Sequence, residues 1–239
     1  LEPTGRSFEL VLVDDGSTDG TRESLLALEG RDPRVRAVLL RRNFGQTAAF
    51  SAGFDRSRGD VVVTSDGDLQ NDPLDIPRLL EKLEQDDLDM VCGWRKERHD
   101  PLSKRVPSFF ANRLISWATG VRLHDYGCSL KAMRGEVARG IRLYGEMHRF
   151  IPAIASWFGA SITEVETNHH PRKFGKSKYG LSRVYKVLLD LMVIKTVVSF
   201  TARPLRWFVL MATPIAIAGL LLVGYALWCW LPPGGDEAA

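Results

Sequence analysis

Short apolar runs alternate along the first half of the chain with segments whose apolar residues recur at helical spacing. Four runs predict buried strands, because each is apolar at successive positions and ends in polar or glycine-rich residues. They cover residues 8–13, 35–40, 60–65 and 90–93. The spacing predicts helices between them, up to about residue 28, then up to about residue 56, and from residue 75 to about residue 85. Strands that alternate with helices in this way predict a parallel α/β sheet.

The second half of the chain is richer in helical patterns. Helices are expected over residues 107–119 and 136–143, a buried helix over 151–158 and a strand over 161–167. From Leu181 to Ile194 apolar residues recur at helical spacing while charged residues fall elsewhere. This pattern is typical of an amphipathic helix that lies on a membrane surface, with an ordinary surface helix as the alternative.

No charged residue occurs between Trp207 and Leu231. A helix of this length is roughly 37 Å long, which is enough to cross the hydrocarbon core of a bilayer. Lys195, Arg203 and Arg206 precede the stretch and no lysine or arginine follows it. By the positive-inside rule, the sequence predicts one transmembrane helix in the inner (plasma) membrane, with the preceding domain facing the cytoplasm. A core helix of a soluble protein is the alternative interpretation.

Composition and charge narrow the choice of partners. The chain has 239 residues and 45% apolar content, which suits one large α/β domain plus a membrane element. Its 32 basic and 29 acidic residues nearly balance, but basic residues crowd between residues 172 and 186, where they would attract an anionic lipid headgroup. Nucleic acid is not an expected partner, because no stacking aromatics or recognised motifs accompany the basic residues. The three cysteines lack metal-binding spacing and are expected to be reduced and structural. No pattern indicates an oligomeric state.

Two acidic loops follow predicted strands. Asp14 and Asp15 come after the first strand, and Asp66 and Asp68 come after the third, with Gln70 close behind. Ligands of open α/β sheets bind beyond the carboxyl ends of the strands, which is where both loops fall. Oxygen ligands of this kind predict a Mg²⁺ or Mn²⁺ site at Asp66, Asp68 and Gln70. The first loop is expected to meet a ribose or base edge, with a plain turn capped by an aspartate as the alternative.

A basic loop lies about a hundred residues further on, over 170–179. Arg172 and Lys178 stand six positions apart across a glycine-containing segment, a spacing suited to clamping phosphate oxygens. Phe174 to Ser177 resembles the end of a Walker A loop, but His170 stands where that motif needs a glycine, which excludes an ATPase of that type. Acidic and basic loops together predict a site for a metal and diphosphates. The membrane stretch that follows indicates that one phosphate belongs to a lipid.

Six motifs resemble glycosyltransferase family 2, specifically the polyprenyl-phosphate glycosyltransferases, which include dolichyl-phosphate mannosyltransferases and bacterial undecaprenyl-phosphate sugar transferases. The motifs are Val-Asp-Asp-Gly-Ser-Thr-Asp at 13–19, Arg-Asn-Phe-Gly at 42–45, Ser-Asp-Gly-Asp-Leu-Gln at 65–70, Asp-Tyr-Gly-Cys-Ser-Leu-Lys at 125–131, Gly-Glu-Met-His-Arg-Phe at 145–150, and the loop from His169 to Tyr179. The resemblance implies a GT-A fold (Rossmann-like, with a mostly parallel sheet), a divalent cation, a UDP- or GDP-linked nucleotide-sugar donor and a polyprenyl-phosphate acceptor.

The resemblance also implies roles for individual residues. Asp66 and Asp68 would lie at the metal and diphosphate, and Asp125 would orient the acceptor or accept a proton. The implied contacts to the nucleotide sugar and its phosphates are Val13, Asp14, Asp15, Ser65, Gly67, Gln70, Arg95, Arg172, Ser177 and Lys178.

The family usually opens with a strand and a Pro-x-Tyr-Asn-Glu type loop, which the residues before Phe8 do not supply. The GT-A domain is therefore expected to be N-terminally incomplete and, as it stands, to bind nucleotide poorly or not at all. Many relatives also carry a second transmembrane helix. The expected segments are a GT-A domain over 1–179, an amphipathic juxtamembrane helix over 180–204, a transmembrane helix over 205–231 and a tail over 232–239.

The implied reaction is an inverting displacement, in which a phosphate oxygen of the lipid attacks the anomeric carbon and the nucleoside diphosphate leaves. A phosphate monoester has its second pKa near about 6, so the nucleophile is largely ionised at neutral pH and needs no strong base. One alternative is a processive polysaccharide synthase of the same fold, although the Gln-x-x-Arg-Trp motif of those enzymes is absent. The other is a non-catalytic membrane protein that keeps the fold as a binding or scaffolding module.

Overall fold

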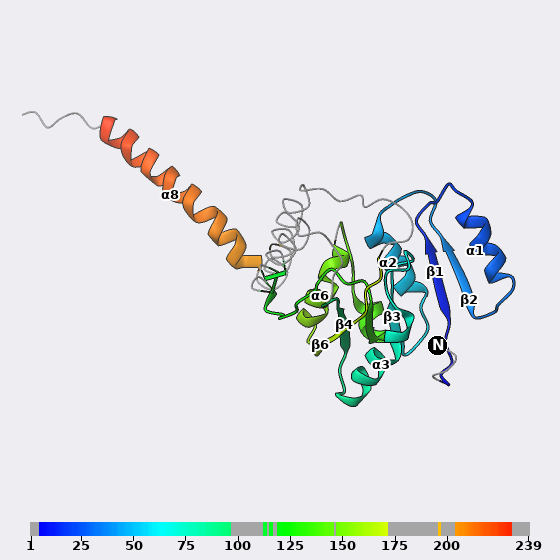
Figure 1. Ribbon diagram of the computed structural model, residues 1–239. Coiled ribbons are helices and arrows are strands. Elements are labelled where there is room, and N and C mark those ends of the chain that lie inside the picture. Colours follow the sequence, from blue (N-terminus) through cyan, green and yellow to red (C-terminus); the bar gives the residue numbers. More distant parts are fainter. Residues whose placement is uncertain are drawn as a thin grey trace, which may run out of the picture. The chain divides into compact units, whose positions relative to one another are not determined.

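The computed structural model describes residues 5–96, 112–113, 115–116, 119–145, 147–171, 196 and 204–230. The chain forms two compact units, Leu1–Asp190 and Leu191–Ala239, drawn in Figure 1. The strands of the first unit are β1 (Leu10–Asp14), β2 (Val35–Leu39), β3 (Val61–Thr64), β4 (Met90–Trp94), β5 (Lys131–Arg134) and β6 (Ile162–Glu166). Its helices are α1 (Thr21–Glu29), α2 (Gln46–Arg56), η2 (Pro73–Asp75), α3 (Ile76–Gln85), α5 (Gly135–Gly140), η3 (Met147–Phe150) and α6 (Ile151–Trp157).

The strands form two separate sheets. β1 and β2 pair in parallel, with Leu10 opposite Val35, and the remaining strands follow the order β3-β5-β4-β6. In the second sheet β4 and β6 are parallel, whereas β5 runs antiparallel to both of its neighbours. The sheet is therefore mixed, and β5 is a strand that the apolar pattern did not predict. Its first residue, Lys131, is 3% exposed, and a buried lysine interrupts the apolar run by which the other strands were found.

The core of the first unit lies on the second sheet. Helix α3 covers one face, where its leucines pack against side chains of β4, β5 and the segment before β5. This cluster consists of Leu79, Leu80, Leu83, Val91, Cys128, Leu130 and Ala132. Strand neighbours such as Met90 and Met133 are also fully buried and point to the opposite face, as alternation along a strand requires. Both faces of this sheet are therefore covered.

The expected elements are found with small shifts at their ends. The helix expected over 136–143 is shorter, because α5 ends at Gly140, whereas the buried helix and strand expected after it correspond to α6 and β6. Residues 112, 113, 115, 116 and 119 are helical, in agreement with the helix expected there. The juxtamembrane helix predicted over 180–204 lies outside the described residues, except for residues 196 and 204.

The second unit contains helix α8 (Pro204–Trp230). Its segment Phe208–Trp230 has 23 residues and a mean hydropathy of 2.1. A helix of this length and composition could span a membrane. Pro214 lies inside it, and the neighbouring hydroxyl of Thr213 donates to the carbonyl of Val209 at 2.7 Å. This is the bond from a threonine hydroxyl to the carbonyl four residues earlier that is common in helices.

Candidate functional site

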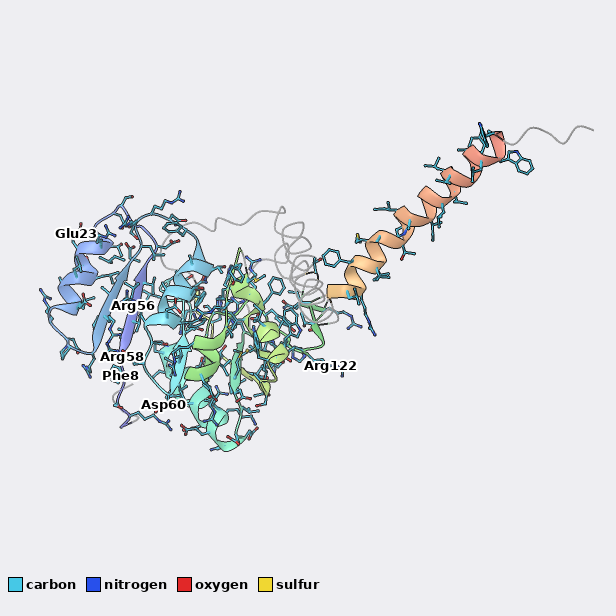
Figure 2. All side chains as sticks on the ribbon, turned by 180° about the vertical axis from the view of Figure 1, so that it is seen from behind. Phe8, Glu23, Arg56, Arg58, Asp60 and Arg122 are labelled. Atoms are coloured by element: carbon cyan, nitrogen blue, oxygen red, sulfur yellow. The ribbon has the colours of Figure 1, made fainter. Side chains whose placement is uncertain are left out.

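The carboxyl ends of β1 and β3 share one edge of the first unit. Figure 2, seen from behind, shows Phe8 and Asp60, which precede these two strands, on the same side of the molecule. The loops that follow the two strands also meet, because Asp15 accepts from the backbone N–H groups of Phe44 and Gly45 and Asp66 accepts from the side chain of Gln46, the next residue. This is the placement that the sequence predicted for the two acidic loops.

Asp66 is held from two sides. Its Oδ1 accepts a hydrogen bond from the side-chain amide of Gln46, the first residue of α2, at 2.7 Å. Its backbone N–H donates to the hydroxyl of Ser129 at 3.3 Å. Asp68 Oδ1 accepts from the backbone N–H of Gln70 at 3.2 Å, which closes a local turn with Leu69 at φ 60. The two carboxylates are thus fixed by the loop itself and by the start of α2.

The acidic loop is joined to the segment that leads into the basic loop. The backbone N–H of His170 donates to the carbonyl of Gln70 at 2.9 Å, and the Gln70 side-chain amide donates to the His170 carbonyl at 3.3 Å. Asn71 and His169 form an antiparallel bridge, and His170 Nε2 lies 3.3 Å from a carboxylate oxygen of Asp72. The basic loop therefore begins beside the acidic loop. Its predicted phosphate ligands Arg172, Ser177 and Lys178 lie outside the described residues.

Asp75 also holds the segment that leads into the basic loop. Its carboxylate is 2% exposed and accepts from the backbone N–H and the side-chain amide of Asn168, at 2.7 and 3.2 Å. Arg78, one turn later in α3, lies 3.4 Å away. A buried carboxylate needs such partners, because an unpaired charge in the interior is costly. Helix α3 and residues 168–171 are thereby held together.

The loop after β1 is tied to the start of α2. Asp14 is buried and accepts from the backbone N–H of Ser17 at 3.1 Å, while the Asp15 oxygens accept from the N–H groups of Phe44 and Gly45 at 2.7 and 2.9 Å. The Asp14 side chain therefore caps the turn that follows β1. Gly16 has φ +74, and a Cβ there would lie 2.4 Å from the carbonyl carbon of residue 42. Only glycine fits this approach.

Arg95 and Asp125, which were predicted to act separately, are paired. Arg95 Nε lies 2.7 Å from Asp125 Oδ2 and Nη2 lies 3.0 Å from Oδ1, a two-pronged ion pair. The backbone N–H groups of Arg95 and Gly127 also donate to this carboxylate, at 3.4 and 3.0 Å. Beside it, the rings of Trp94 and His124 stack at 4.4 Å. The end of β4 is thus clamped to the loop before β5.

The buried cysteines carry no reactive thiolate. Burial raises the pKa of the Cys92 thiol to about 12 and also raises the pKa of Cys128. Both sulfurs are free of disulfides and lie in the sheet core. The expected structural role of these cysteines agrees with this environment.

Asp66 and Asp68 fit a divalent cation by their chemistry. In the described part of the chain, no group of three or more histidine, cysteine or acidic side chains is placed to hold a metal. A site with two carboxylates suits Mg²⁺ or Mn²⁺ when phosphate and water oxygens complete the ligand shell. Such a site would form only together with a phosphate-bearing ligand.

The family model of glycosyl transferase family 2 matches residues 1–141. The chain belongs to glycosyltransferase family 2. Among curated family members, it is 47% identical over 222 residues to the dodecaprenyl-phosphate galacturonate synthase of Rhizobium johnstonii, covering 91% of this chain and 66% of that protein. It is 43% identical over 224 residues to the undecaprenyl-phosphate 4-deoxy-4-formamido-L-arabinose transferase of Pseudomonas aeruginosa, covering 93% of this chain and 64% of that protein. The chain thus spans just under two thirds of the length of these relatives.

Solved structures of glucosyl-3-phosphoglycerate synthase from Mycobacterium tuberculosis show the same fold. One complex with Mn²⁺, UDP-glucose and phosphoglyceric acid and another with Mg²⁺ and UDP each give a TM-score of 0.56 at 22% identity. Each match covers 77% of this chain and 68% of the solved chain. The family 2 domain described here therefore has a GT-A-like fold, as expected.

Four side chains of the site were not identified from the sequence. Gln46 and Ser129 hold Asp66, and Thr47 pairs with the buried His148 at 2.9 Å. Ser129 and His148 lie inside motifs that carried the family resemblance, and Gln46 directly follows another. Their position in or beside these motifs was the available signal. Hydrogen bonds between residues 20 or more positions apart, however, leave no periodic pattern in the sequence from which they could be predicted.

Proposed function

We propose that this chain carries the catalytic part of an inverting glycosyltransferase, which moves a sugar from a nucleotide-sugar donor to a polyprenyl phosphate in the membrane. The observation that carries the proposal is the junction between Gln70 and His170. It sets the start of a basic loop beside two carboxylates that suit a divalent cation. A donor diphosphate bound there would meet a cation on one side and arginine and lysine side chains on the other.

In this proposal the acidic loop binds the donor through Mg²⁺ or Mn²⁺. Asp66 and Asp68 would hold the cation, which offsets the charge that develops on the departing nucleoside diphosphate. Gln46 and Ser129 keep the Asp66 loop in place, while Val13, Asp14 and Asp15 shape the nucleotide side of the pocket. The sugar identities named for the two relatives, a galacturonate and a formamido-arabinose, make UDP-linked derivatives of such sugars the first donors to test.

Asp125 acts in this proposal by holding Arg95. Four N–H groups are directed at its two oxygens, which matches the number of acceptor positions of a carboxylate. A proton acceptor would have to give up one of these partners during the reaction. The arrangement thus favours a role in which Asp125 orients the Arg95 guanidinium for a phosphate, and the ionised lipid phosphate attacks without a general base.

Helix α8 places the reaction at a membrane in this proposal. Its apolar segment has the length of a single span, and Arg206 stands at its amino-terminal end whereas residues 231–239 contain no lysine or arginine. This asymmetry supports a catalytic unit on the cytoplasmic side of the inner membrane. The proposal divides the chain into a GT-A domain over 1–179, a juxtamembrane helix over 180–204 and a transmembrane span over 205–231.

The test is transfer of radiolabelled sugar from UDP- and GDP-linked donors to undecaprenyl phosphate in membranes that contain the full-length gene product. We expect a chloroform-soluble product that disappears with EDTA and with Asp68→Ala. A water-soluble polymer instead would indicate a processive synthase. No product from any donor, with the protein folded and inserted, would favour a binding or scaffolding module and contradict the proposal.

A further inference from the structure

The start of helix α2 is fixed by groups outside the helix. Its cap residue is Gly45, at φ 94 and ψ 164, and no side-chain cap is present. Serine, threonine or aspartate at this position would normally supply an oxygen to the first turn, and glycine cannot. The carboxylate of Asp15 instead holds the residues just before the helix, by accepting from the backbone N–H groups of Phe44 and Gly45.

His148 holds the same turn from the other side. Its Nδ1 lies 2.9 Å from the hydroxyl of Thr47, and its backbone N–H donates to the same hydroxyl at 3.4 Å. Both residues are buried, at 7% and 5% exposure, and Phe50 stacks on the imidazole at 6.4 Å with an angle of 20°. A hydroxyl can donate one hydrogen bond and accept two, so Thr47 can accept from the His148 backbone and still pair with Nδ1 in either tautomer of the ring.

Between these two anchors stands Gln46, whose amide holds Asp66 at 2.7 Å. Thr47 is the next residue, so a shift of the Thr47 backbone moves the point from which the Gln46 side chain reaches the acidic loop. Asp15 already belongs to the proposed nucleotide site, whereas His148 has no assigned role. The contacts form a continuous chain from His148 through Thr47 and Gln46 to Asp66.

We propose that His148 is a positioning residue, which fixes the first turn of α2 so that Gln46 presents the Asp66 carboxylate to a divalent cation in one orientation. This inference rests on the proposed function, because it takes Asp66 as a metal ligand. It adds a residue of η3, about 80 positions beyond Asp66 in the sequence, to the group that determines metal affinity. His148 itself does not contact the metal.

The primary measurement is the Mn²⁺ affinity of the full-length gene product, read from the electron paramagnetic resonance signal of free Mn²⁺ in the presence of UDP. His148→Leu removes Nδ1, the partner of the Thr47 hydroxyl, and fills the buried position with an apolar side chain. Thr47→Val removes the hydroxyl at nearly constant volume. Loss of one buried hydrogen bond that orients a ligand corresponds to about 1 kcal/mol or slightly more, so we expect the Mn²⁺ dissociation constant to rise about five- to tenfold in each variant. His148→Asn, whose Oδ1 can replace Nδ1 as acceptor, should restore affinity to within about twofold.

A double-mutant cycle with Gln46 tests the route. If His148 acts through Gln46, His148→Leu should lower affinity in the natural background and add almost nothing in a Gln46→Ala background. Ser57→Ala is the matched control, because it removes a hydrogen bond to the Phe54 carbonyl at the other end of α2 and should leave Mn²⁺ affinity unchanged. Thr47→Val serves as the smaller change if the leucine variant does not fold.

The outcomes separate this inference from the proposed function. A protein that binds Mn²⁺ with UDP, and whose His148→Leu and Thr47→Val variants melt at lower temperature with unchanged affinity, would show that the pair is only structural and overturn the inference alone. An unsubstituted protein that binds no Mn²⁺ with UDP would overturn the metal site itself. Full additivity of His148→Leu and Gln46→Ala would also overturn the route through Gln46.

Discussion

Replacing either member of the Arg95–Asp125 pair should reveal which role the carboxylate plays. Asp125 is 2% exposed, whereas the Arg95 side chain retains 18% of its exposure. The pair is therefore buried on the acidic side and close to solvent on the basic side. Removing Arg95 takes away the cation that faces this buried carboxylate, and removing the charge of Asp125 leaves a guanidinium that can turn toward water.

The magnitude follows from this asymmetry. Breaking a buried ion pair by removing one partner costs about 3–5 kcal/mol. Arg95→Met belongs at the upper end of that range, because the charge left behind is the deeply buried one. Asp125→Asn belongs near about 3 kcal/mol or below, since the amide keeps an oxygen for the Gly127 N–H and the exposed edge of Arg95 can regain water. We expect urea unfolding, followed by tryptophan fluorescence in detergent, to show this order.

The kinetic effect distinguishes positioning from base catalysis. If Asp125 only orients Arg95, Asp125→Asn should raise the KM for the donor and lower kcat by less than about tenfold, with the pH profile of kcat keeping its shape. Loss of a general base typically costs about 10²–10⁴-fold in rate. Should Asp125→Asn lose turnover on that scale, together with the rising limb of the pH profile and without loss of stability, the reasoning from its filled acceptor positions would be refuted.

Three further substitutions test other parts of the fold. Asp75→Asn should destabilise the first unit by about 3 kcal/mol in urea unfolding and weaken donor binding, because it disrupts the charge-assisted hydrogen bonds to Asn168 that hold the start of the basic loop; undiminished donor affinity would argue against that link. Gly16→Ala should abolish nucleotide binding in a titration while the protein stays folded, since its Cβ would meet backbone at 2.4 Å; binding at normal affinity would contradict the tight loop contact. The pKa of Cys92 in the folded protein is about 12, above the value of about 8.5 in the unfolded chain. As the pH rises between these values, the unfolded chain loses its thiol proton while the folded protein keeps it. The free energy of unfolding therefore falls with rising pH, by up to about 1.4 kcal/mol per pH unit. Urea unfolding at about pH 8 and about pH 10 should therefore show a steeper loss in the natural protein than in Cys92→Ala, and equal slopes would refute the assignment.

The sequence predicted those elements whose pattern is local. The apolar runs that became β1, β3 and β4 and the helical spacing of α3 were visible because burial on one or both faces imposes a short period. The uncharged stretch that became α8 was visible for the same reason, as its length alone indicates a span. β5 was missed because Lys131 breaks its apolar run, and its antiparallel direction follows from a connection that no local pattern records.

The candidate site was predicted less completely, because loops come together through the fold. The placement of both acidic loops at one edge followed from the direction of the strands. The pairing of Arg95 with Asp125 could not be read from two residues 30 positions apart, each of which suits a phosphate or a metal alone. Likewise, the family resemblance implied that Asp15 contacts the nucleotide. The structure adds that its oxygens accept hydrogen bonds from the backbone of the loop before α2.

The division of the strands into two sheets has a consequence for handling this protein. β1 is hydrogen-bonded only to β2, and β3 only to β5, among the strands that the structure contains. Within the described residues, each therefore has one edge that no other strand covers, and the valines and leucines of β1 and β3 are partly buried or exposed. Edges of this kind pair readily with any extended apolar segment. Solutions of this chain should consequently become turbid at a rate that rises steeply with concentration, and a lysine placed at Val11 should slow that association.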